Sequence, residues 1–132
     1  MYKRSVLLGS IRAFGRLIRI DRPIGILLLL WPTLTALWIS SSGIPDLKLL
    51  IIFSVGTLVM RSAGCCINDY ADANFDGHVN RTKNRPIIIG EITRKQALFS
   101  FGALCFLAFI LVLFLNLKTI ILSIGGFCLA AI

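Results

Sequence analysis

The sequence predicts an all-α protein whose helices form a bundle across a membrane, and two features of the sequence support this. The 132 residues are 57% hydrophobic and 15% charged, with a mean hydropathy of +0.87, whereas soluble domains are about 45–50% apolar and about 25% charged. Long apolar runs also alternate with basic segments, which give a net charge of +8. This combination favours a membrane protein with cationic loops over a nucleic-acid-binding protein, and it excludes a disordered chain.

The apolar runs predict the positions of the membrane helices. A helix needs about 20 residues to cross roughly 30 Å of hydrocarbon, and three runs reach that length: residues 24–42, 47–67 and 96–116. We expect the shorter run 119–132 to be a truncated transmembrane helix, so that residues 1–132 form the N-terminal part of one transmembrane domain. A signal peptide also begins with a basic segment and an apolar run, but here the small residues 40–43 form no A-x-A-like cleavage site, and two further spans follow.

The positive charges predict the orientation of the chain. Residues 1–22 carry six Lys and Arg residues and residues 77–95 carry five, whereas the other two connections carry one each. Because positive loops face the cytoplasm, we expect the N-terminus and the 77–95 loop to be cytoplasmic. Within the basic segment, residues 6–20 are predicted to form an interfacial helix, with an apolar stripe on the lipid bilayer and arginines on another face. A generic anchor that only sets the topology is the alternative.

Three side chains that can bind a cation recur every four residues at the end of the second span: Asn68, Asp72 and Asp76. On a helix this spacing puts them on one face, with Asp69 at its edge. Carboxylates stacked in this way repel one another and oppose the helix dipole, so a cation should compensate. Because carboxylates completed by phosphate oxygens are typical Mg²⁺ ligands, we predict that Mg²⁺ bridges this face to a diphosphate.

Four basic residues accompany the acidic face. Arg81, Lys83 and Arg85 follow it in the next loop, where they can contact phosphate oxygens directly. Arg61 is the one charge between residues 49 and 67 of the second span, and a charge at that depth usually faces a bundle interior or a wet cavity. We predict that Arg61, with Asp69, lies at a pocket, where it supports the acidic face or binds an anionic substrate group.

Simpler interpretations of these residues also exist. The acidic face could be a solvated helix end, and Arg61 could form a structural ion pair or reach the membrane surface. Residues 72–77 match the start of an EF-hand calcium loop, although the twelfth position is Lys83 rather than Glu. The four cysteines show no zinc-binding spacing, so we expect them to pack as small apolar residues.

Residues 68–86 strongly resemble the first signature of the UbiA superfamily of intramembrane prenyltransferases. That signature reads N-D-x-x-D-x-x-x-D and then R-T-x-x-R-P, and both parts are present here. Residues 19–25, 30–33 and 61–65 are similar to the bacterial branch of this family that acts on 4-hydroxybenzoate. The chain departs from the family in residues 87–90, which read Ile-Ile-Ile-Gly where Leu-Pro-x-Gly is usual.

The resemblance implies a bundle of about nine transmembrane helices in the bacterial inner membrane. It implies Mg²⁺-dependent transfer of a polyprenyl group from polyprenyl diphosphate to the ring of 4-hydroxybenzoate, in ubiquinone synthesis. Asn68, Asp72 and Asp76 match the metal–diphosphate motif, with the two aspartates as catalytic residues, and Arg81 and Arg85 match its basic continuation. Because the second acidic motif of the family lies in its later half, we expect residues 1–132 to be inactive alone.

Two other functions fit the same residues. A related prenyltransferase with another acceptor, such as a naphthoate, haem or chlorophyll precursor, would keep the acidic and basic segments. A membrane transporter or cation-binding bundle would use an acidic residue in its pathway. That second function gives no reason for the paired arginines Arg81 and Arg85.

Overall fold

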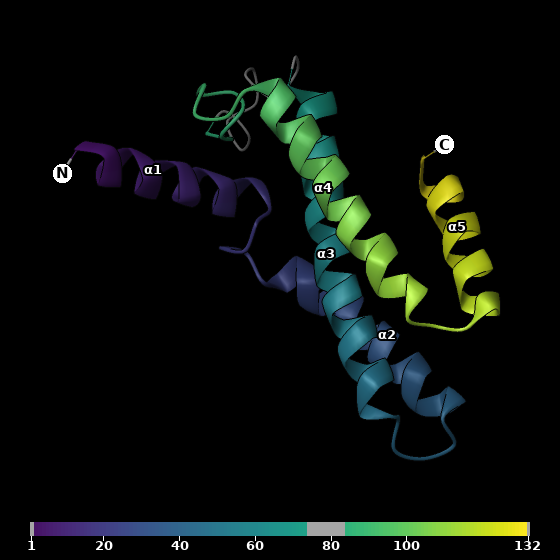
Figure 1. Ribbon diagram of the computed structural model, residues 1–132. Helices are drawn as coiled ribbons and strands as arrows, with labels where there is room; N and C mark the ends of the chain where they lie inside the picture. Colours follow the sequence, from purple (N-terminus) through teal and green to yellow (C-terminus); the bar gives the residue numbers. More distant parts are fainter. Residues whose placement is uncertain (1, 74–83, 132) are drawn as a thin grey trace.

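The chain is helical in the part that the computed structural model describes, residues 2–73 and 84–131 (Figure 1). Its five helices are α1 (Tyr2–Leu17), α2 (Ile24–Ser40), α3 (Leu47–Asp72), α4 (Arg94–Leu113) and α5 (Leu117–Ala131). No strand occurs within these two ranges. The all-α prediction is therefore confirmed.

Helix α3 is the centre of the arrangement. It packs extensively against α4 and α2 and more lightly against the end of α1. Successive helices from α2 to α5 reverse direction, whereas α1 extends sideways from the others (Figure 1). The start of α3 therefore lies beside the end of α2, and the end of α3 near Asp72 lies beside the start of α4 (Figure 1).

Local hydrogen bonds set the helix boundaries. Helix α2 ends at Ser40, two residues before the expected boundary, because the hydroxyls of Ser40 and Ser41 donate to the Leu37 carbonyl and Ser42 has a positive φ of 50°. Helix α3 begins where expected, with the Asp46 side chain accepting a hydrogen bond from the Lys48 backbone N–H.

Helix α4 begins at Arg94 because Thr93 and Gln96 form a capping box. It begins two residues before the expected boundary and ends at Leu113, three residues before the expected end. The backbone N–H of Thr93 donates a hydrogen bond to the Gln96 side chain, and the backbone N–H of Gln96 donates one to the Thr93 hydroxyl oxygen. These two hydrogen bonds fix the first turn of α4 directly after the 84–93 segment.

The outer surfaces of the helices suit a membrane. Helices α3 and α4 are long and apolar enough to cross one, by length and composition. Helices α2 and α5 are also apolar but have 17 and 15 residues. Large side chains are exposed to the surroundings, including Trp31, 77% exposed, and Phe99, 79% exposed. Lipid accepts such side chains without the free-energy cost that water imposes; the number of complete spans stays a prediction.

The two basic segments of the chain meet at one end of α3. Ala13 and Leu17 of α1 are buried there with Cys66, Ile92 and Ala97, which form a small apolar core. Arg16 of α1 also pairs with Glu91, just before α4. The end of α1 and the residues that precede α4 therefore lie on the same side of the bundle. The orientation of that side in the membrane stays a prediction.

Part of the expected apolar stripe at residues 6–20 does not pack against the bundle, although Ile18, just after α1, packs against the small apolar core. Ile11 is 60% exposed and Phe14 is 39% exposed, whereas Ala13 and Leu17 make the buried contacts. The side chains of Ile11 and Phe14 are thus exposed to the surroundings of the protein. The interfacial position of this helix stays a prediction.

Candidate functional site

The last turns of α3 carry the described part of the acidic face. Asn68 is exposed, and the side chain of Asp72 is 56% exposed. Both lie on α3, as the spacing predicted, and both can be reached by a ligand. Asp76, Arg81 and Lys83 lie outside the described residues, so their predicted roles stay predictions.

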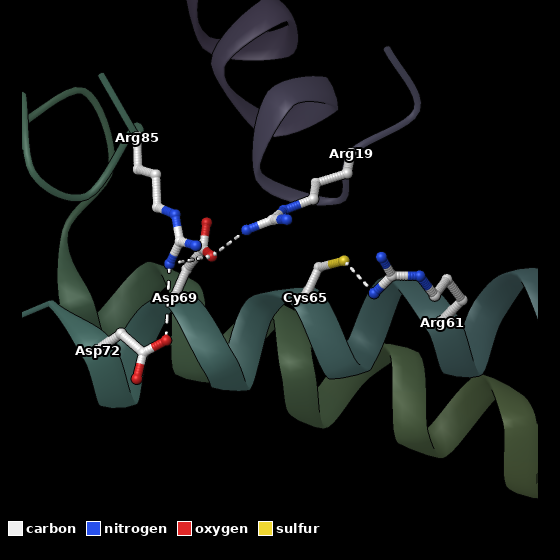
Figure 2. A network of polar contacts seen from close by, with 6 residues as sticks. All are labelled: Arg19, Arg61, Cys65, Asp69, Asp72 and Arg85. Carbon is white, nitrogen blue, oxygen red and sulfur yellow. Dashed lines mark hydrogen bonds and ion pairs between the residues drawn. The ribbon is translucent and has the colours of Figure 1, made fainter. Parts of the chain in front are cut away.

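Asp69 differs from its neighbours because it is buried, with 2% of its surface exposed. Two arginines reach it from distant parts of the chain. Arg19, between α1 and α2, and Arg85, before α4, each place a guanidinium nitrogen 3.1 Å from its Oδ1 atom (Figure 2). A buried carboxylate needs such partners to offset its lost hydration.

Arg85 links the buried carboxylate to the exposed one. The Nη1 atom of Arg85 lies 3.1 Å from Asp69 and 3.7 Å from an oxygen of Asp72. The backbone around Arg85 is held by turns, since its carbonyl accepts hydrogen bonds from the N–H groups of Ile88 and Ile89. Gly90 then has a φ of 77°. The chain thus keeps a tight turn in the segment that departs from the usual family sequence.

Arg61 lies further along the same face of α3. It donates a hydrogen bond from Nη1 to the Cys65 sulfur at 2.9 Å (Figure 2). It also lines a cavity of about 790 Å³, whose wall is largely apolar and comes from α2, α3, α4 and α5. Asp69 is not part of this wall. Arg61 is thus placed at a pocket, while Asp69 is enclosed by arginines.

Because Gly25, in the first turn of α2, has no side chain, the guanidinium of Arg61 can lie directly against it. A Cβ atom on Gly25 would lie 2.6 Å from Nη2 of Arg61 and 2.9 Å from its Nε atom. Both distances are too short for nonbonded atoms, so the arginine side chain would have to move. The sequence reasoning missed this role because Gly25 lies in an apolar run with no local signal of a distant partner.

We expect Gly25→Ala to displace the Arg61 guanidinium. If the enzyme uses Arg61, the change should slow its reaction. Membrane insertion should stay intact, because Ala has a higher helix propensity than Gly and so does not weaken α2. Gly43→Ala is the matched control, since a Cβ there meets no atom within 4 Å. Equal activity of the Gly25 and Gly43 variants would contradict the positioning of Arg61 by Gly25.

The described oxygen donors fit one side of a Mg²⁺ site. Among residues 2–73 and 84–131, no group of three or more His, Cys, Asp and Glu residues could hold a metal ion. Mg²⁺ does not need such a group when a substrate is present, because one or two carboxylates, phosphate oxygens and waters complete its shell. Asp72 can supply the carboxylate and Asn68 an amide oxygen, whereas Asp69 is already engaged by two guanidinium groups.

Sequence comparisons relate this chain to membrane enzymes. A profile described as the UbiA prenyltransferase family matches residues 29–132. A 4-hydroxybenzoate octaprenyltransferase of Saccharophagus degradans is 57% identical over 124 residues, which cover 94% of this chain and 42% of the relative. The enzyme of the same name from Providencia stuartii is 56% identical over 126 residues, which cover 96% of this chain and 44% of the relative.

A third relative gives the same relation. The 4-hydroxybenzoate octaprenyltransferase of Tolumonas auensis is 55% identical over 128 residues, which cover 97% of this chain and 45% of the relative. The chain therefore spans somewhat less than half the length of these relatives. No solved structure gives a significant match.

Proposed function

Because this chain belongs to the UbiA prenyltransferase family, we propose that it forms part of a membrane enzyme that prenylates 4-hydroxybenzoate for ubiquinone synthesis. The donor is a polyprenyl diphosphate, and the enzyme lies in the bacterial inner membrane with its N-terminus and the 77–95 loop in the cytoplasm. The observation that carries the proposal is the position of Arg85 between the carboxylates of Asp69 and Asp72. It supports the proposal because the exposed carboxylate of Asp72, which would bind the metal, lies beside the guanidinium of Arg85, which would bind phosphate.

The diphosphate end of the donor binds at the last turns of α3. Asn68 and Asp72, with Asp76, would hold Mg²⁺ through their oxygens, and Arg85, with Arg81 and Lys83, would bind phosphate oxygens. When bound, Mg²⁺ supplies positive charge that stabilises the leaving diphosphate. The guanidinium of Arg85 adds hydrogen bonds that fit the planar arrangement of two phosphate oxygens.

The reaction exchanges one bond for another. The allylic C–O bond breaks and its electron pair leaves with the diphosphate. The aromatic ring then attacks the allylic carbon with the ring carbon next to its hydroxyl, and the proton on that ring carbon passes to the released diphosphate, which restores the aromatic ring. The apolar cavity keeps water away from the cationic carbon, and its largely apolar wall suits the prenyl chain.

Arg61 binds the second anionic group of the reactants. It lies 11 positions before Asp72 on α3, about 16 Å along the helix axis, so both cannot bind one phosphate group. The carboxylate of 4-hydroxybenzoate is the other anion present. Its binding to Arg61 would direct the ring toward the diphosphate end of the cavity.

A chimera tests the proposed function. In it, residues 1–132 replace the matching part of the Saccharophagus degradans relative, and membranes that contain it are supplied with polyprenyl diphosphate, 4-hydroxybenzoate and Mg²⁺. We expect prenylated 4-hydroxybenzoate from the chimera and none from residues 1–132 alone, because these residues span less than half the length of the relatives.

The acceptor and the class of protein are tested in the same membranes. Faster prenylation of a naphthoate or of a haem precursor than of 4-hydroxybenzoate would contradict the proposed acceptor. Ion flux across the membrane without any prenyl transfer would contradict the proposed enzyme. Normal turnover by residues 1–132 alone would contradict the need for the remaining length of the enzyme.

A further inference from the structure

The buried carboxylate of Asp69 is unusual within the described helices. Among the residues whose side chains the structure describes, it is the one charged group that is fully buried. Its side chain is 2% exposed, whereas the side chain of Asp72 is 56% exposed. Its position therefore suits the holding of other side chains better than the binding of a ligand.

The two partners of Asp69 have different relations to the proposed diphosphate site. Arg85 contacts Asp72 as well, at 3.7 Å, whereas Arg19 pairs, within the described residues, with Asp69 and not with Asp72. Arg19 has a φ of 56°, a left-handed conformation that residues other than glycine rarely adopt. The turn between α1 and α2 is thus bent in the way that brings Arg19 to Asp69.

The distances show how Arg85 is shared. Its Nη1 atom is 0.6 Å closer to Asp69 than to Asp72, as the 3.1 Å and 3.7 Å separations give. Without the charge of Asp69, an attraction that holds Arg85 away from Asp72 would be lost, while the attraction to Asp72 would remain. The guanidinium would then move closer to the exposed carboxylate of Asp72, where it would compete with a metal ion.

We propose that Asp69 is a positioning residue, whose buried carboxylate holds Arg85 beside Asp72 while leaving the outer oxygens of Asp72 open to a metal-bound diphosphate. This inference rests on the proposed function of the Asp72 site. Arg19 serves as the second, structural partner, which balances the charge of the buried carboxylate. Within the described residues, the side chains of Arg19, Asp69, Arg85 and Asp72 then alternate in charge, and a doubly charged metal and an anionic substrate can join them together.

Other contacts hold the same segments in place when Asp69 is replaced. Leu17 is fully buried against the core formed with Cys66 and Ala97, and Arg16 pairs with Glu91. The docking of α1 therefore does not depend on Asp69 alone. This separation allows a variant that changes the position of Arg85 without releasing α1.

The test compares Asp69→Asn with Arg19→Gln in the chimera. For Asp69→Asn we expect the KM for polyprenyl diphosphate to rise about 10- to 100-fold, the range typical when a residue that orients a ligand-binding group is lost. The KM for 4-hydroxybenzoate should stay unchanged. For Arg19→Gln we expect a lower thermal stability and an unchanged KM for the diphosphate. Asp46→Asn, which keeps a capping side chain at the other end of α3, is the matched control.

A double-mutant cycle tests the contact itself. Arg85→Lys should raise the KM for the diphosphate in the wild-type background and raise it much less when Asp69 is already Asn. A merely structural role predicts that Asp69→Asn and Arg19→Gln act alike, lowering the amount of folded protein and changing both KM values together. Either that result or independent effects of Asp69 and Arg85 would overturn the proposal.

A binding measurement separates this inference from the proposed function. Magnesium pyrophosphate is titrated into the wild-type chimera and its Asp69→Asn variant, with no prenyl donor present. Weaker binding by the variant supports the positioning role even if 4-hydroxybenzoate is not the acceptor. Equal binding by both proteins overturns the positioning role even if the chimera prenylates 4-hydroxybenzoate normally.

Discussion

Replacing Asp72 with Ala is expected to remove most prenyl transfer while the protein still inserts into the membrane. Asp72 is the exposed carboxylate beside Arg85, so its loss takes away a proposed direct ligand of the metal. Residues that only orient metal ligands already contribute about 10- to 100-fold to affinity or activity. We therefore expect turnover of the chimera to fall by at least about 100-fold.

The measurement compares initial rates in membranes that hold equal amounts of inserted protein. Asp72→Asn keeps the shape of the side chain and removes its charge, so it should lose nearly as much activity as the Ala variant. Asp46→Asn tests the same chemical change at the other end of α3 and should keep wild-type activity. Near-normal rates for both Asp72 variants would show that the metal assignment is wrong.

Replacing Arg61 with Met is expected to weaken the binding of 4-hydroxybenzoate much more than that of the prenyl donor. The guanidinium lines the cavity and donates a hydrogen bond to the Cys65 sulfur. A hydrogen bond to a charged group contributes about 1.5–3 kcal/mol, which corresponds to a rise in KM of about 10- to 150-fold. Met keeps an unbranched apolar side chain of similar length at the cavity wall.

An acceptor without a carboxylate provides the control for Arg61. Phenol should react slowly with both the wild-type chimera and the Arg61→Met variant, and with the same KM, because it lacks the group that Arg61 binds. A KM for phenol that rises as much as the KM for 4-hydroxybenzoate would point to a damaged cavity. Equal rises in the KM of donor and acceptor would contradict the proposed role of Arg61.

The sequence was sufficient for the features that depend on local spacing. Apolar runs of the right length predicted an all-α membrane protein, and a four-residue spacing placed Asn68 and Asp72 on the last turns of α3. Helix boundaries were less accurate, because they depend on individual caps. The hydroxyls of Ser40 and Ser41 end α2 early, and the Thr93–Gln96 capping box begins α4 early.

The features that depend on distant parts of the chain could not be predicted. Asp69 and Arg19 are separated by 50 positions, and no periodicity relates them. Their pairing follows from the turn between α1 and α2 and from the burial of Leu17 at the end of α3. The contact between Gly25 and Arg61 likewise requires the packing of α2 on α3, which hydropathy alone does not specify.

Chelation of divalent ions tests the central claim, that oxygens at the end of α3 hold a metal against a lipid diphosphate beside Arg85. Prenyl transfer by the chimera is followed while EDTA is titrated into the membranes and Mg²⁺ is then added back. We predict that turnover disappears as free Mg²⁺ is removed and returns when it is restored, and that Asp72→Asn does not recover at the same Mg²⁺ concentration. Turnover that is indifferent to the chelator would contradict the account.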